Sequence, residues 1–256
     1  MKIKNYFLFF VLLLIFTGCS KDNVNDPAVI DKSANLKALG FSANELVSDE
    51  KFTSLKIEVV YVTGFQPTQT TLDNLKTFLE NRTYKPDGIS ITTRAVASSN
   101  KAPFNITEIA QIEADERTAY NAGDEIAVFI YFADGSNEND TDTKTVLGTS
   151  FRNTSMVIYG KTVQFIANHS NNLERSTVES TVLNHEFGHL FGLVNMGTLM
   201  QTNHEDGESN GHCNVTGCLM SASFQFGGSM MNVIESNTIP VLDPLCIADI
   251  QANGGR

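Results

Sequence analysis

The sequence predicts an α/β domain in which a largely parallel sheet is covered by helices. From residue 55 onward, short runs rich in β-branched and aromatic residues alternate with runs whose apolar residues recur every three or four positions. Alternation of strand and helix favours parallel strands with helices packed over the sheet. The chain has 256 residues, which is enough for one domain with a substantial core and an additional leader segment.

Five segments have the composition of strands and are bounded by turn residues. The third, "EIAVFIYFADG", is apolar almost throughout, which is typical of a central strand that is buried on both faces. The predicted strands are 55–64, 88–98, 125–135, 144–151 and 155–167.

The helices are predicted from apolar spacing and from their end signals. In the third of them, Asn105 and Glu108 are placed to form a capping box, and Gly123 is expected to end the helix. The predicted helices are 42–48, 68–82, 105–123 and 171–193.

The first 18 residues have the pattern of an export signal. Lys2 and Lys4 precede an unbroken apolar run of 11 residues from Tyr6 to Phe16, which suits a signal-peptide core and is too short to span a bilayer. The following "FTGC" resembles the lipobox of bacterial lipoproteins. This resemblance implies cleavage before Cys19 and attachment of a lipid to its thiol.

We therefore divide the chain into a lipoprotein signal peptide (1–18), a polar tether ending in a short helix (19–50) and one main domain (51–256). The sequence "SKDNVND" resembles the export tag of surface lipoproteins in Bacteroidetes-type bacteria. The two resemblances imply a location in the cell envelope, anchored through Cys19 to the outer membrane of a Gram-negative bacterium. They leave open which face of that membrane carries the protein.

The chain is acidic, with 18 basic and 29 acidic residues. Loss of the leader removes Lys2 and Lys4, which leaves 16 basic residues and changes the net charge from −11 to −13. A surface of this sign repels nucleic acid and anionic lipid, so neither is an expected partner. A monomer is expected.

The last predicted helix contains "HEFGHLFGLVN", residues 185–195. His185 and His189 are four residues apart and share a helix face, so their imidazoles can converge on one ion. Glu186 is placed to reach a metal-bound water without being a ligand. These are the groups that metal-assisted hydrolysis needs. An apolar stripe is expected to pack behind them, leaving the front open: Leu183, Phe187, Leu190 and Val194.

A catalytic zinc needs a third protein ligand and one open position. The sequence "HEFGHLFGLVN" resembles the metzincin peptidases, in which the helix stops at a glycine, here Gly192, and a third histidine follows three residues later. Asn195 occupies that position here, and its amide is a poor zinc ligand. The downstream "HCNVTGCLM" (212–220) resembles the archaemetzincin branch, in which the third histidine precedes Cys-x4-Cys-x-Met. This implies His212 as third ligand and Met220 as a methionine packed under the histidines.

Other third ligands remain open. His204 is the main rival of His212, and Glu205 or Asp206 would provide an acidic ligand instead. His169, which precedes the helix, is expected to be a surface or capping histidine.

The cysteines depart from the archaemetzincin pattern. That family carries a later Cys-x-x-Cys that completes a second, structural zinc site, whereas this chain has only Cys246 in the region. A four-cysteine zinc is therefore excluded. Cys213 and Cys218 are predicted to form a disulfide instead.

The resemblance implies a metzincin-like twisted mixed sheet with covering helices and an active-site helix. It also implies a Zn²⁺-dependent endopeptidase that acts on protein or peptide substrates. Zinc on His185, His189 and His212 would lower the pKa of its water, with Glu186 as the catalytic general base. The strand at 144–151 is nominated to pair with the substrate.

The alternative function is a surface binding lipoprotein with a structural, non-catalytic zinc. It requires a closed site in which both His204 and His212 bind the ion.

Overall fold

The computed structural model describes residues 31–142, 144–169, 173–224 and 237–256. The predicted signal peptide, the predicted lipid attachment at Cys19 and the predicted tether up to residue 30 lie outside the described residues.

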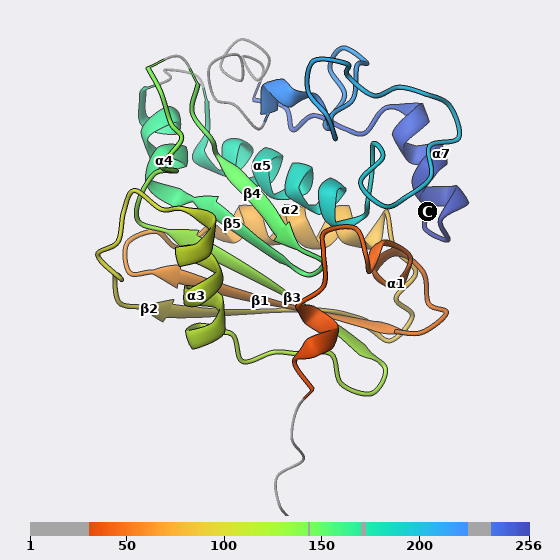
Figure 1. Ribbon diagram of the computed structural model, residues 1–256, viewed down its shortest axis with the longest axis horizontal. Coiled ribbons are helices and arrows are strands. Elements are labelled where there is room, and N and C mark those ends of the chain that lie inside the picture. Colours follow the sequence, from red (N-terminus) through yellow and green to blue (C-terminus); the bar gives the residue numbers. More distant parts are fainter. Residues whose placement is uncertain (1–30, 143, 170–172, 225–236) are drawn as a thin grey trace, which may run out of the picture.

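A five-stranded mixed sheet in the order β2-β1-β3-β5-β4 forms the centre of the domain (Figure 1). The strands are β1 (Ser54–Val62), β2 (Gly88–Val96), β3 (Glu125–Ala133), β4 (Gly148–Arg152) and β5 (Ser155–Tyr159). Strands β2, β1, β3 and β5 are parallel, and β4 pairs antiparallel with β5 at one edge. The predicted mixed, largely parallel sheet is confirmed. Strand β3 is central and is buried from Ile126 onward, as its apolar sequence predicts.

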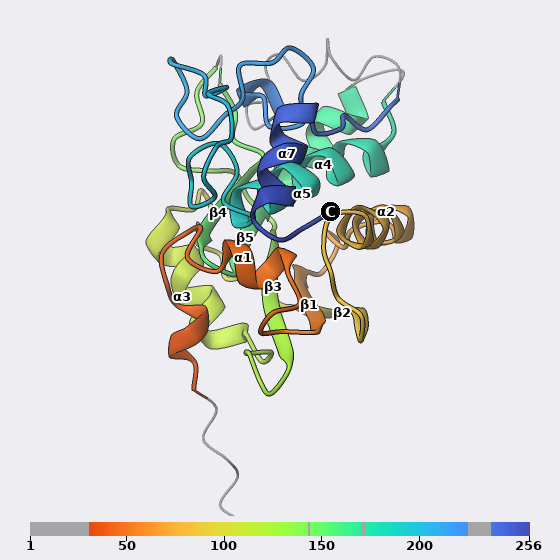
Figure 2. The same ribbon diagram turned by 90° about the vertical axis from the view of Figure 1, so that its right-hand side faces the viewer.

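Helices cover both faces of the sheet, with α3 on one side and α2 on the other (Figure 2). The helices are α1 (Ala43–Val47), α2 (Gln69–Glu80), α3 (Ile106–Glu116), α4 (Gly160–His169), α5 (Arg175–Leu190) and α7 (Pro244–Ala252). Two short 3-10 helices lie at Ser33–Asn35 and Ala222–Phe224. In the described residues, no helix is both long enough and apolar enough to cross a membrane.

Successive side chains of each strand point to opposite faces, so the sheet separates two cores. On the larger side, Ile57 and Val59 of β1 face the core formed with α2 and α5, which contribute Leu75 and Phe187. The smaller core packs α3 against the other face, and its members include Val60, Phe129, Tyr131, Ile109 and Ile112. Most of the helices, including α5, therefore pack on one side of the sheet.

The segment before β1 is part of the folded unit. The short helix predicted at 42–48 is present as α1, and its Leu46 and Val47 belong to the larger core. Upstream, the buried Asn35 donates through Nδ2 to the Ala127 carbonyl of β3, at 3.0 Å. The described part of the N-terminal segment thus packs against the domain.

Two predicted elements differ from the structure. The strand predicted at 155–167 ends at Tyr159 and continues as α4, whose Val163, Ile166 and Ala167 are buried at helical spacing. Its apolar residues suit either conformation, and packing against the sheet selects the helix.

The helix predicted at 105–123 begins with the predicted Asn105–Glu108 capping box but ends at Glu116. Arg117 leaves the helix because its buried guanidinium bonds to Glu113 Oε1 and to the Ala127 carbonyl, both at 2.8 Å. A tertiary anchor, not Gly123, therefore ends α3.

Candidate metal centre

Helix α5 carries two histidines into the protein interior. All of its residues from Thr177 to Leu190 are buried, including His185 and His189. Neighbouring elements therefore bury this helix almost completely, and what is left of the predicted open front is the cavity beside His189. Some of its buried polar side chains bond to neighbouring elements; for example, Glu179 accepts from the Thr71 hydroxyl of α2 at 2.6 Å.

The structure brings three imidazoles together. The Nε2 atoms of His185 and His189 lie 3.1 Å apart on one turn of α5. His212, which comes from a distant loop, has its ring centroid 5.3 Å from that of His185 and 5.1 Å from that of His189. One ligand nitrogen from each ring lies within 4.8 Å of the others.

This arrangement fits a zinc ion. Two nitrogens bound at ~2.05 Å to a tetrahedral zinc lie ~3.3 Å apart, close to the observed 3.1 Å. His185 donates through Nδ1 to the Leu219 carbonyl at 2.7 Å, which leaves the lone pair of Nε2 directed at its neighbours. Nδ1 of His212 lies 3.1 Å from the Asn210 carbonyl, so its Nε2 is likewise the nitrogen on the ligand side.

Burial keeps the helix histidines neutral, the form that binds metal. It lowers the pKa of His185 to about 3, with a smaller contribution from His212, and it lowers the pKa of His189 well below its usual value.

The rival third ligands lie elsewhere. His204 is buried, but its Nε2 lies 3.5 Å from both Asp249 Oδ2 and Cys246 Sγ. Asn195 is exposed, and its amide donates to Glu205 Oε2 at 3.4 Å. In the described part of the chain, the cluster that contains His185 and His189 takes only His212 as a further member.

The chain leaves α5 through a sharp turn. Gly192 has a φ of +72°, and a Cβ at this position would lie 2.6 Å from the Thr198 amide nitrogen. A side chain there is excluded both by the left-handed backbone and by the approach of the returning loop. Gly192 therefore ends the helix as the sequence motif predicts.

Glu186 is fully buried beside the edge strand β4. Its Oε2 accepts from the Ser150 amide at 2.7 Å, and the Ser150 hydroxyl donates to the Glu186 carbonyl at 2.8 Å. Its Oε1 has no hydrogen-bond partner among the described residues. Burial raises the pKa of Glu186 to about 7, although the bonds from Ser150 oppose the shift. A carboxylate with one free oxygen and this pKa suits a general base.

A cavity of about 300 Å³ gives access to the histidines. Its lining residues are Leu39, Ser150, His189, Met196, Ser209, Asn210, Gly211 and His212. The cavity is bounded by segments far apart in sequence, and it places the imidazole edges of His189 and His212 within reach of a bound molecule.

Comparison with solved structures finds archaemetzincin from Methanopyrus kandleri, with a TM-score of 0.52 at 16% sequence identity. The similarity covers 78% of this chain and 96% of that chain. The fold is archaemetzincin-like. Comparison with protein-family models and with curated protein sequences gives no match.

Within this archaemetzincin-like fold, Met220 lies under the histidine turn, as predicted. A Cβ on Gly188, which stands between the two histidines of α5, would lie 2.1 Å from Met220 Sδ. The glycine thus allows the methionine to pack directly against the helix backbone.

Met220→Ala is expected to lower the free energy of unfolding by about 2–5 kcal/mol, because it empties a buried site. Met220→Leu conserves volume and is expected to lower it by less than about 1.5 kcal/mol. Urea unfolding of the two variants measures the difference. Equal stability of Met220→Ala and wild type would show that this packing contributes little.

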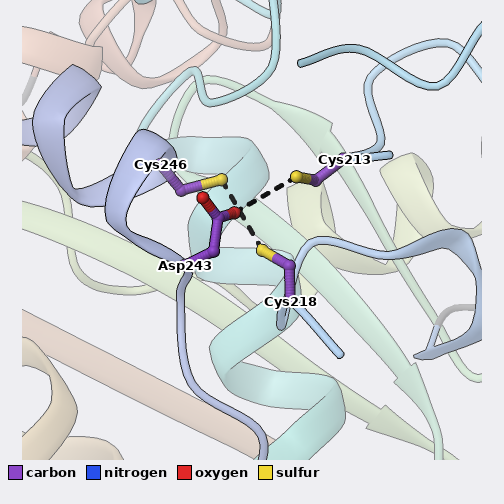
Figure 3. A group of neighbouring side chains, drawn as sticks. All are labelled: Cys213, Cys218, Asp243 and Cys246. Carbon is purple, nitrogen blue, oxygen red and sulfur yellow. Dashed lines mark hydrogen bonds between the residues drawn. The ribbon is translucent and has the colours of Figure 1, made fainter. Parts of the chain in front are cut away.

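The predicted disulfide between Cys213 and Cys218 is wrong. Both residues and Cys246 are free thiols, and Cys218 Sγ lies 3.7 Å from Cys246 Sγ. Figure 3 shows that the three sulfurs gather around the carboxylate of Asp243.

Several residues of the site carry no sequence signal. Ser150 and Leu219 act through backbone groups that any residue possesses, and Leu39 and Met196 reach the cavity only because the chain folds back on itself. His169 is exposed and stacks on Phe165, consistent with its prediction as a surface histidine.

Proposed function

We propose that this chain is a zinc-dependent endopeptidase whose zinc is held by His185, His189 and His212. The observation that carries the proposal is the convergence of three buried imidazoles. Glu186, the residue after His185, is also buried and has one carboxylate oxygen without a hydrogen-bond partner among the described residues. Three histidines leave a fourth tetrahedral position available, as a catalytic zinc requires. The archaemetzincin-like fold supports this function without determining it.

A zinc ion bound there would act as a Lewis acid, lowering the pKa of water and polarising a peptide carbonyl. Glu186 would take the proton of the attacking water on Oε1 and later deliver it to the leaving amine. The Ser150 amide holds Oε2, so the carboxylate keeps its orientation while its other oxygen exchanges the proton.

The substrate is proposed to be a protein or peptide that lies along β4. This strand overlaps the segment predicted at 144–151, forms one edge of the sheet and contacts α5. An extended peptide can form main-chain hydrogen bonds with such an edge strand, and these bonds hold it in place whatever its sequence. The cavity beside His212 would then receive a substrate side chain.

The alternative of a closed, structural histidine zinc lacks support, because His204 faces Cys246 and Asp249.

Incubation of the purified protein with a mixed peptide library tests the proposed peptidase activity. Cleavage should disappear with a zinc chelator and return with added Zn²⁺. Absence of cleavage from the zinc-loaded protein would contradict the proposed activity.

The location is also a proposal: a lipid on Cys19 would hold the protein in the outer membrane. The leader with Lys2, Lys4 and the apolar run supports this. Cys19→Ser is expected to move the protein from the membrane fraction to the soluble fraction after cell lysis. An unchanged membrane fraction for this variant would refute the lipid anchor.

A further inference from the structure

A further cavity, of about 210 Å³, lies between the end of α2, helix α5 and residues 239–242, which lead into α7. It shares no lining residue with the cavity beside His189 and His212. Sites for drug-sized ligands usually measure about 300–1,000 Å³, so this smaller cavity suits a single small molecule.

One wall of the cavity carries a buried amide oxygen without a partner. Asn184 of α5 is only 4% exposed, and its Oδ1 accepts no hydrogen bond from the described residues. Such an atom is unusual inside a protein and indicates a donor supplied from elsewhere. Asn74 of α2 also lines the cavity and donates through Nδ2 to Ser180 Oγ at 3.1 Å, which leaves its own Oδ1 available. The cavity therefore offers amide oxygens to a ligand that carries N–H groups.

The cavity is positively charged, although the chain as a whole has a net charge of −11. Arg82 lines it, and no carboxylate does so in the described part of the chain. Arg82 Nη1 donates to the Asn81 carbonyl at 3.1 Å, whereas Nε has no partner among the described residues. Burial lowers the pKa of Arg82, as expected for a guanidinium whose burial no acidic neighbour offsets, but an arginine stays charged in a protein. A guanidinium of this kind attracts a carboxylate.

The remaining wall is apolar. Phe78 of α2 stacks on Phe191 at the end of α5, with ring centroids 6.2 Å apart, so its position is fixed by the larger core. Across the cavity, Ile239 and Val241 belong to the segment before α7, and Val241 is 69% exposed. An apolar group bound here would cover part of that exposed side chain.

We propose that this cavity binds a free α-amino acid with an apolar side chain. Its carboxylate would pair with Arg82, and its ammonium group would donate to the amide oxygens of Asn184 and Asn74. Its side chain would lie against Phe78 and Val241. Each of the three chemical groups of such a molecule meets a complementary part of the wall, and this site does not depend on the chain being a peptidase.

The wall of the cavity is bonded to the support of a helix histidine. The Val241 carbonyl accepts from the Leu219 amide at 2.9 Å, and the Leu219 carbonyl accepts from His185 Nδ1 at 2.7 Å. A ligand that holds Val241 in place would restrict the group that orients His185. Binding at the cavity and at the histidines is therefore expected to be coupled, and the coupling must act equally in both directions. This coupling, unlike the cavity site, rests on the proposed zinc.

Ligand-observed NMR of the purified protein with L-leucine tests the site. We expect saturable binding of one molecule per chain. Leucinamide lacks the carboxylate and 4-methylpentanoate lacks the ammonium group, so each is expected to bind about 10- to 100-fold more weakly, the usual effect of losing a hydrogen bond to a charged group. Leucine is also expected to bind several-fold more tightly to the zinc-loaded protein than to the metal-free protein.

Three variants test the contacts. Arg82→Met keeps an apolar stem without the charge and should weaken leucine binding by about 10- to 100-fold. Asn184→Ala removes the buried acceptor and should weaken it by about 3- to 10-fold. Lys76→Met, at an exposed position of α2, is the matched control and should bind leucine like wild type. Thermal unfolding checks that all three are folded.

The proposal is overturned if wild type shows no saturable leucine binding, or if leucinamide binds as well as leucine. Because both comparisons use wild type, they hold even if a variant fails to fold. Wild-type affinity in folded Arg82→Met would equally refute the role of the guanidinium. Leucine binding without peptide cleavage refutes only the peptidase, cleavage without leucine binding refutes only the cavity site, and equal leucine affinity with and without zinc refutes only the coupling.

Discussion

Glu186→Gln is expected to lower the rate of peptide cleavage by at least about 10²- to 10⁴-fold, the usual contribution of a general base. The amide can still accept the hydrogen bond from the Ser150 backbone, so the local structure should persist. It cannot take up a proton, and the pKa of about 7 that suits Glu186 to this step is lost with the carboxyl group. Steady-state cleavage of a peptide substrate measures the effect.

The matched control is Glu174→Gln at the exposed N-cap position of the same helix, which is expected to leave the rate unchanged. Zinc content and thermal unfolding should be the same for both variants and wild type. Wild-type cleavage by Glu186→Gln, with zinc bound, would rule out Glu186 as the base.

His212→Ala is expected to weaken binding of the zinc that supports cleavage by more than about 100-fold. Loss of a residue that only hydrogen-bonds to a metal ligand already weakens metal binding by about 10- to 100-fold, and loss of the ligand itself should weaken it further. The imidazole lies against both helix histidines, and no side chain at the cavity edge replaces it. Titrating metal-free protein with zinc while following peptide cleavage reports on this site alone.

His204→Ala tests the rival ligand in the same titration. Since His204 lies beside Cys246 and Asp249, its loss should leave the zinc dependence of cleavage within a few-fold of wild type. His169→Ala provides an exposed control. If His204→Ala required far more zinc than His212→Ala, the ligand role would belong to His204.

Much of the fold follows from local pattern. Strand β3 is recognisable by its apolar run, and α3 begins at the capping box of Asn105 because both signals depend only on neighbouring residues. The errors arise where distant contacts decide. Segment 160–169 becomes a helix through packing against the sheet, and α3 ends where Arg117 finds buried partners.

The candidate site divides in the same way. His185, Glu186 and His189 are placed by helix periodicity, which sets the spacing of one turn whatever surrounds it. The position of His212 follows from a motif resemblance, and its role as a ligand stays a prediction. The state of the cysteines is mispredicted because the contacts that gather them, with Asp243 and Cys246, join Cys218 to residues 25 or more positions away.

The local sequence by itself thus determines the relative placement of the two helix histidines and the adjacent glutamate. It also determines the alternation of strands and helices along the domain. Which loop meets that helix, which thiols meet a carboxylate, and how the edge strand holds Glu186 depend on contacts between residues tens of positions apart. Such contacts form only when the sheet and its helices pack, because burial of their apolar faces fixes the relative positions of distant segments. The local sequence of one segment does not indicate which other segment it will contact.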